Sequence, residues 1–173
     1  MFGTVGMNWE LRPDPTADPL GQMNDCFNMR PRITLADLTD GLGQTAFASE
    51  RAMGYINRDL NGSLGRWASS FTTETLIYAM QPPNAVFRLS TRDPGLGAMF
   101  QAASSFHPGG VNVLMGDGSA RLVKETVDGW PIDPGRMLPV GVTTFADGFG
   151  NLPPPGTWQK LTTRSGGEPF DDL

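Results

Sequence analysis

His107 is the only histidine in the chain, so a catalytic triad or an imidazole metal ligand would have to use it. Ser104 and Ser105 precede it and Asp117 follows it, which are the residue types of a Ser-His-Asp nucleophilic site. The chain has no Gly-x-Ser-x-Gly motif to expose a nucleophilic serine. We therefore predict a structural role, in which the turn that begins at His107 positions the imidazole to hydrogen-bond to Asp117 or Glu50.

Glu50 follows an apolar run and is a candidate for a buried carboxylate, which needs a partner. Arg164, Arg51 and His107 are the candidate partners, and an ion pair is favoured over an acid/base role. A metal-dependent hydrolase built on His107, Asp117 and Glu50 is the least favoured function, because catalytic zinc sites usually take two or three histidines.

Oxygen ligands at short spacing occur at Asp147 and Asn151, with Asp117 as a further candidate. The segment 147–151 resembles a calcium loop but lacks the twelve-residue pattern and closing glutamate of an EF-hand. Asp117-Gly118 is more typical of a turn. Calcium therefore remains a candidate cofactor, and no other cofactor is predicted.

Composition limits the class of protein. The chain of 173 residues fits one domain, and its 22 glycines and 15 prolines favour frequent turns and short elements. A net charge of -5 without a lysine or arginine block argues against binding to nucleic acid. The apolar stretches fall far short of the roughly 20 residues of a membrane-spanning helix, so the chain alone is expected to be soluble. Cys26, the only cysteine, is predicted to be a small, semi-buried residue.

A β-hairpin over residues 111–123 is the clearest predicted element. Val111, Val113 and Met115 alternate with Asn112 and Leu114, so the apolar residues share one face. The turn residues 116–119 contain Asp-Gly, which tolerates positive φ and fixes the register of the strands.

The other predicted elements are short. Strands are expected at 2–5 and 45–50, and Thr34 with Asp37 predicts a capping box for one or two helical turns that end at Gly41. Residues 72–80 fit a helix or an extended segment, and Pro82 ends either one. Residues 130–155 are expected to form a loop. A closing helix is predicted over 157–164, capped by Thr157 and stopped at Gly166.

Four sequence blocks, taken together, resemble a known family. The histidine at 107, nine further residues and Asp117-Gly118 resemble the signature of the prepilin-type, processing-associated H-x9-DG proteins. The other blocks follow in that family's order: residues 33–50, with Thr39-Asp40-Gly41 and Glu50, then Pro82-Pro83-Asn84, then 161–168.

The resemblance implies an α+β, strand-dominated, pilin-like head, with an antiparallel sheet and long Pro/Gly-rich loops. It divides a single domain of residues 1–173 into a loop-rich start (1–30), a family-like region (31–168) and a frayed tail (169–173). Family members begin with a prepilin leader and a long apolar helix, which this sequence lacks, so a shortened form of a longer chain is expected. Membrane contact would need that helix.

The function implied by the resemblance is that of a non-catalytic subunit in a type II secretion or type IV pilus-like assembly. Its partners would be other pilin-like subunits or secretion-system components, in the periplasm or at the cell surface. The alternative is an exported binding module, with glycans as a candidate ligand and Trp9, Trp67, Trp130 and Trp158 as a binding platform.

Overall fold

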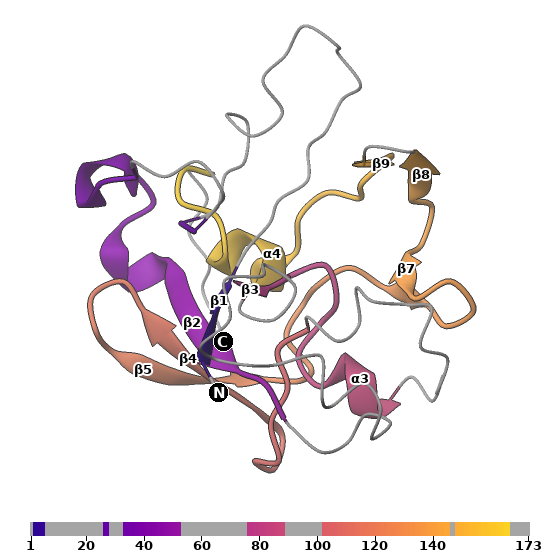
Figure 1. The fold of residues 1–173 in the computed structure, drawn as a ribbon, viewed down its shortest axis with the longest axis horizontal. Coiled ribbons are helices and arrows are strands. Elements are labelled where there is room, and N and C mark those ends of the chain that lie inside the picture. The colour runs from indigo at the N-terminus through magenta and orange to yellow at the C-terminus, as the bar shows by residue number, and fades with distance from the viewer. Residues whose placement is uncertain are drawn as a thin grey trace, which may run out of the picture.

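A computed structural model of the protein describes residues 2–5, 26–27, 33–52, 76–88, 102–145 and 148–166. These residues form an α+β, strand-dominated fold, as predicted (Figure 1). Several predictions fall outside the described residues: the loop-rich character of most of 1–30, the structure of 72–75 and the frayed tail at 169–173. Within the described ranges, no helix is long and apolar enough to cross a membrane.

A five-stranded sheet forms the centre of the fold, with the strand order β3-β1-β2-β4-β5 (Figure 1). The strands are β1 (Phe2–Val5), β2 (Ala46–Glu50), β3 (Leu76–Ile77), β4 (Gly110–Met115) and β5 (Ala120–Lys124). Three of the four pairings are antiparallel, as expected, whereas β1 and β3 run parallel. Of the ambiguous segment 72–80, residues 76–78 are extended, and residues 79–80 form a turn.

The predicted hairpin is confirmed as β4 and β5, with Val111 opposite Val123 and Leu114 opposite Ala120. Val111, Val113 and Met115 are buried, whereas Leu114 is 42% exposed. The alternation therefore sets one face of the hairpin against the core and leaves the other face toward solvent.

The core lies against the buried face of the sheet. The helix α4 (Thr157–Leu161) places Trp158 and Leu161 in one apolar cluster with side chains from β2, β3, β4 and β5. Full burial of such side chains contributes roughly 1.5–3 kcal/mol each. The Trp158 indole also donates to the Gln81 carbonyl oxygen over 2.9 Å, which ties the helix to the segment after β3.

The predicted limits of the closing helix were wrong at both ends. Its N-cap is Gly156, and Thr157 is already helical. Asp128, a residue far away in sequence, accepts hydrogen bonds from the Thr157 amide at its carboxylate and from the Trp158 amide at its carbonyl. The helix ends at Leu161, well before Gly166, because the Thr162 and Thr163 amides bond within a final tightened turn.

Two 3₁₀ turns confirm the short helical segment predicted before β2. They are η1 (Leu35–Asp37) and η2 (Leu42–Gln44). The Asp37 carboxylate accepts hydrogen bonds from the Thr34 amide (2.6 Å) and hydroxyl (2.8 Å), and these bonds lower the pKa of Asp37. The first turn ends before Gly41, the predicted end of the helical segment. Gly41 instead lies between the two turns, with a φ of 96°.

The prediction of a loop over residues 130–155 was wrong. Two small antiparallel ribbons occur there: β6 (Ile132–Asp133) with β7 (Leu138–Pro139), and β8 (Thr143–Phe145) with β9 (Gly148–Gly150). The first ribbon turns at Asp133, whose carboxylate accepts a hydrogen bond from the Gly135 amide. A four-residue helix, α3 (Ala85–Arg88), was not predicted either.

Candidate functional site at the two ends of the hairpin

The strand β4 separates the two halves of the H-x9-DG signature. His107 lies before its first residue, Gly110, and Asp117 lies after its last residue, Met115. A six-residue strand advances about 17 Å from its first residue to its last. Of the two predicted partners of His107, Asp117 was therefore the wrong one, because an extended strand holds the two residues at opposite ends.

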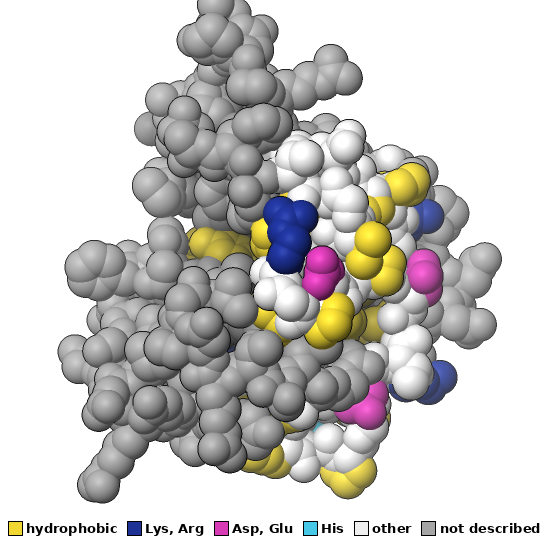
Figure 2. All heavy atoms as spheres, turned by 90° about the vertical axis from the view of Figure 1, so that its right-hand side faces the viewer, with side chains coloured by type: hydrophobic (Ala, Val, Ile, Leu, Met, Phe, Trp, Pro, Cys, Tyr) yellow, Lys and Arg dark blue, Asp and Glu magenta, His cyan; other side chains and the backbone are white. Residues whose placement is uncertain are grey.

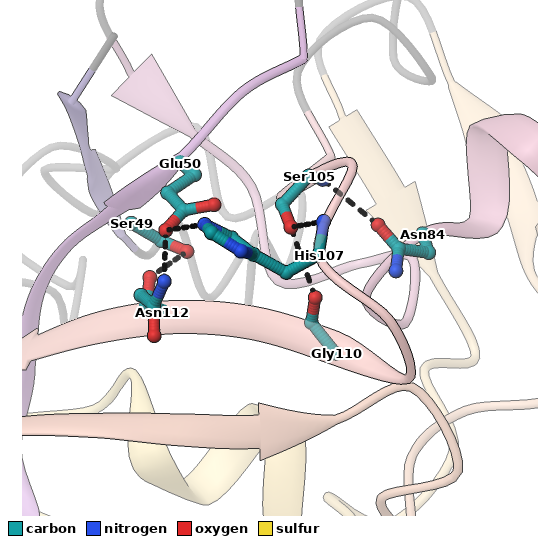
Figure 3. A network of polar contacts seen from close by, with 7 residues as sticks. All are labelled: Ser49, Glu50, Asn84, Ser105, His107, Gly110 and Asn112. Atoms are coloured by element: carbon teal, nitrogen blue, oxygen red, sulfur yellow. Dashed lines mark hydrogen bonds and ion pairs between the residues drawn. The ribbon is translucent and has the colours of Figure 1, made fainter.

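At the histidine end, Glu50 is the partner of His107 (Figure 3). The imidazole Nε2 lies 3.5 Å from Glu50 Oε1, and the same oxygen accepts a hydrogen bond from the Asn112 side-chain amide. The imidazole is 58% exposed and the Glu50 side chain 19% exposed. Glu50 thus connects β2 with β4 and with the loop before β4. The loop contact is made through His107, one of the three predicted partners of Glu50. Arg51, another candidate, instead donates to the Leu76 carbonyl oxygen.

The Arg51 guanidinium is buried beside the strand β3. Its burial lowers the pKa of Arg51 to about 10, so the side chain remains cationic at neutral pH. It therefore serves as a buried donor between β2 and β3.

The loop that carries His107 is fixed mainly by Ser105 (Figure 3). The Ser105 hydroxyl donates to the Gly110 carbonyl oxygen over 3.0 Å and accepts a hydrogen bond from the His107 amide over 2.8 Å. The loop then enters β4 at Gly110, where a Cβ atom would lie 2.3 Å from the Val123 carbonyl oxygen. Only glycine lets the two strands approach this closely.

Asn84, in the Pro-Pro-Asn block, connects this loop to two further segments. Its side-chain oxygen accepts a hydrogen bond from the Ser105 amide over 2.9 Å, and its side-chain NH₂ donates to Glu125 over 3.2 Å. Its backbone amide donates to the Ala103 carbonyl oxygen. Asn84 is buried and has a φ of 59°, a conformation that asparagine tolerates better than most residues. No role is predicted for this residue from the sequence, although an asparagine after two prolines was the available signal.

At the aspartate end, the side-chain contacts are local, whereas backbone contacts reach η2. The Asp117 carboxylate accepts hydrogen bonds from the Ser119 amide (2.8 Å) and hydroxyl (2.6 Å), which lower the pKa of Asp117. Gly118 has a φ of 85°, as the turn prediction required. The Asp117 amide donates to the Leu42 carbonyl oxygen and the Gly116 amide to that of Thr45, so the hairpin tip is bound to η2.

Asp40, in the Thr-Asp-Gly block, binds the closing block of the sequence. Its carboxylate accepts hydrogen bonds from the Gly166 amide over 2.7 Å and from the Thr163 hydroxyl over 3.5 Å. Its amide donates to the Arg164 carbonyl oxygen. Two of the signature blocks therefore meet in space although 123 residues separate Asp40 from Thr163.

The residues considered for catalysis are engaged in other contacts. Ser105 bonds within its own loop, and the Ser104 hydroxyl accepts a hydrogen bond from the Ala52 amide. The set of His107, Glu50 and Asp117 is not assembled, because Asp117 lies at the far end of β4. Among the described residues, no three histidine, cysteine, aspartate or glutamate side chains are grouped to hold a metal ion.

Part of the segment predicted to resemble a calcium loop forms a strand. The segment 148–150 is the strand β9, paired with β8, and the exposed Asn151 follows it with a φ of 59°. Asp147 lies outside the described residues. Asp117 uses its carboxylate to fix the hairpin turn.

The structure describes two of the four tryptophans considered for a glycan platform. Trp130 and Trp158 are buried, whereas Trp9 and Trp67 lie outside the described residues. Cys26 is buried, with 9% of its surface exposed.

Comparison with known proteins places the chain in a family. The model of the family described as "Protein of unknown function (DUF1559)" matches residues 3–129, which is well over half of the chain. The protein therefore belongs to that family, which is the group of H-x9-DG proteins. Neither a curated protein nor a solved structure matches the chain.

Proposed function

We propose that the chain is the head of a non-catalytic, pilin- or pseudopilin-like subunit of a type II secretion or type IV pilus-like assembly in the cell envelope. The observation that carries this proposal is how the signature residues are used. The side chains of His107 and Asp40 contact distant segments of the same fold, and that of Asp117 fixes its own turn, so all three stabilise a scaffold. A scaffold of this kind suits a protein whose function is to present a surface.

The outer face of the hairpin is the surface that we assign to subunit contacts. We define it by Asn112 and Leu114 of β4 and Leu122 of β5, which point away from the core. Leu114 is 42% exposed and Leu122 is 50% exposed, and Phe106 in the adjoining loop is 71% exposed. Neighbouring exposed apolar side chains on a small domain are typical of a contact surface between proteins.

Photocrosslinking in the native bacterium tests this function. The full-length gene product would carry p-benzoylphenylalanine in place of Leu122, and crosslinked partners would be identified by mass spectrometry. We expect crosslinks to other pilin-like subunits or secretion-system components. Val140, an apolar residue 55% exposed beside the small ribbon β6–β7, is the matched control position and should give few of them.

Two results would contradict the proposal. One is the absence of crosslinks to envelope subunits from position 122 in a protein that accumulates normally. The other is an equal pattern of crosslinked partners from positions 122 and 140, since this would show that the outer face of the hairpin has no particular role.

A further inference from the structure

A hollow of about 370 Å³ lies beside the Pro-Pro-Asn block, between the segment before α3 and the segment after β5. Its volume falls within the range of roughly 300–1,000 Å³ that is usual for ligand sites. The walls that matter for its chemistry are Pro82, Glu125, Val127, Trp130, Pro131 and Ile132. Figure 2 shows one side of the molecule, on which hydrophobic side chains reach the surface between charged ones.

The walls of the hollow are rigid before any ligand arrives. The Trp130 indole Nε1 donates to the Pro154 carbonyl oxygen over 2.9 Å, and the Trp130 amide donates to the Gln159 side chain over 3.2 Å. Pro82 and Pro131 have fixed φ angles. A preformed site loses little conformational entropy on binding, so weak contacts can be sufficient for recognition.

The charge of the hollow is negative. Of its lining residues, all of which the structure describes, Glu125 alone is ionisable. Glu125 is held in place, because its carboxylate accepts a hydrogen bond from Asn84 and its amide donates to the Gly109 carbonyl oxygen. The Glu125 carboxylate attracts a cation to the hollow. The net charge of -5 adds a field of the same sign.

The apolar walls favour a ligand that has a hydrocarbon part as well as a charge. A cation that also has a hydrocarbon stem can lay the stem along the prolines, Val127 and Ile132 while its charged end reaches Glu125. Lysine and arginine side chains have this composition. We propose that this hollow binds the side chain of a lysine or arginine carried by a partner polypeptide. The proposal depends on the hollow alone and stands whether or not the chain is a pilin-like subunit.

Peptide titration followed by nuclear magnetic resonance tests the proposal. Three blocked tripeptides, Ala-X-Ala with lysine, arginine or norleucine at X, would be added to the ¹⁵N-labelled protein while the amide signals of Val127, Gly129 and Ile132 are followed. Norleucine keeps the stem and lacks the charge. We expect saturable shifts with lysine and arginine, and binding about tenfold weaker with norleucine.

Two variants locate the effect. Glu125→Gln keeps an acceptor for Asn84 but removes the charge, so the lysine peptide should bind as weakly as the norleucine peptide. Asp117→Asn removes the same charge at the far tip of the hairpin and should preserve the difference between the two peptides.

Four results would overturn the proposal: no shift with any peptide, equal binding of lysine and norleucine peptides, an equal loss of binding in both variants, or binding of free butylamine as tight as that of the lysine peptide. The last result would mean that a free amine, not a polypeptide, is recognised. If Glu125→Gln fails to fold, the comparison of lysine with norleucine on the parent protein decides the question.

Discussion

The two ends of β4 carry the two halves of one sequence signature but are held by different means. At the histidine end, side chains from distant parts of the chain meet: Glu50 is 62 residues from its hydrogen-bond partner Asn112, and Asn84 is 21 residues from Ser105. At the aspartate end, Asp117 bonds to Ser119, two residues away, and backbone amides bind the tip to η2.

This difference shows which end depends on the whole fold. The turn at Asp117 can be formed by a short stretch of sequence, since its side-chain partner lies in the same turn. The loop at His107 has local bonds from Ser105, but its position also depends on β2 and the Asn84 segment. Substitutions at the histidine end should therefore destabilise the fold more than those at the aspartate end.

The largest expected effect is that of Gly110→Ala, where the histidine loop enters β4. The added Cβ would lie 2.3 Å from the Val123 carbonyl oxygen, so β4 and β5 must move apart. We expect the free energy of unfolding to fall by about 3 kcal/mol. Urea unfolding would measure it, with Gly135→Ala as the control, because a Cβ there makes only an ordinary contact at 3.4 Å. Equal stability of the two variants would contradict the close packing at Gly110.

Asn84→Ala should have the next largest effect. It removes both side-chain hydrogen bonds and leaves the buried Ser105 amide without its acceptor, which costs about 2 kcal/mol. Asn151→Ala is a matched control, because Asn151 has the same φ of 59° but is exposed. The control therefore reports backbone strain alone. Equal losses of stability in the two variants would show that the hydrogen bonds of Asn84 contribute nothing.

A smaller, pH-dependent effect is expected at the aspartate end. Hydrogen bonds from Ser119 lower the pKa of Asp117 in the folded protein, so the ionised carboxylate stabilises the turn above its ordinary pKa of about 3.9. That contribution is lost as the pH falls through the lower, folded-state pKa. Thermal unfolding of the parent and of Asp117→Asn should differ at pH 6 and converge as the pH approaches 2. A difference that stays constant over this range would rule out titration of Asp117 as the cause.

The parts of the fold that follow from local patterns could be predicted from the sequence. The alternation of Val111, Val113 and Met115 predicted the hairpin and its buried face, and Asp117-Gly118 predicted its turn. These signals are local, because side-chain alternation and positive φ depend on a few neighbouring residues.

The parts that depend on distant contacts were missed or wrong. The start of α4 is set by Asp128, and the role of Asn84 is set by Ser105 and Glu125, which no short window of sequence contains. The ribbons β6–β7 and β8–β9 have strands of two or three residues, too short for an alternating pattern to be read. The sequence narrowed the partner of His107 to Glu50 or Asp117. The choice depends on the pairing of β2 with β4, which brings Glu50 to Asn112 and which no local pattern shows.

A double-mutant cycle tests most directly whether His107 serves as a structural tie to Glu50. The free energies of unfolding of His107→Ala, Glu50→Gln and the double variant would be measured in urea at low salt. A parallel cycle would use His107→Ala, Asp117→Asn and their double variant. The partly exposed pair should give a coupling energy of roughly 0.5 kcal/mol between His107 and Glu50. No coupling beyond experimental error is expected between His107 and Asp117. Additive losses for His107 and Glu50, or coupling of His107 to Asp117 instead, would contradict this account of the signature.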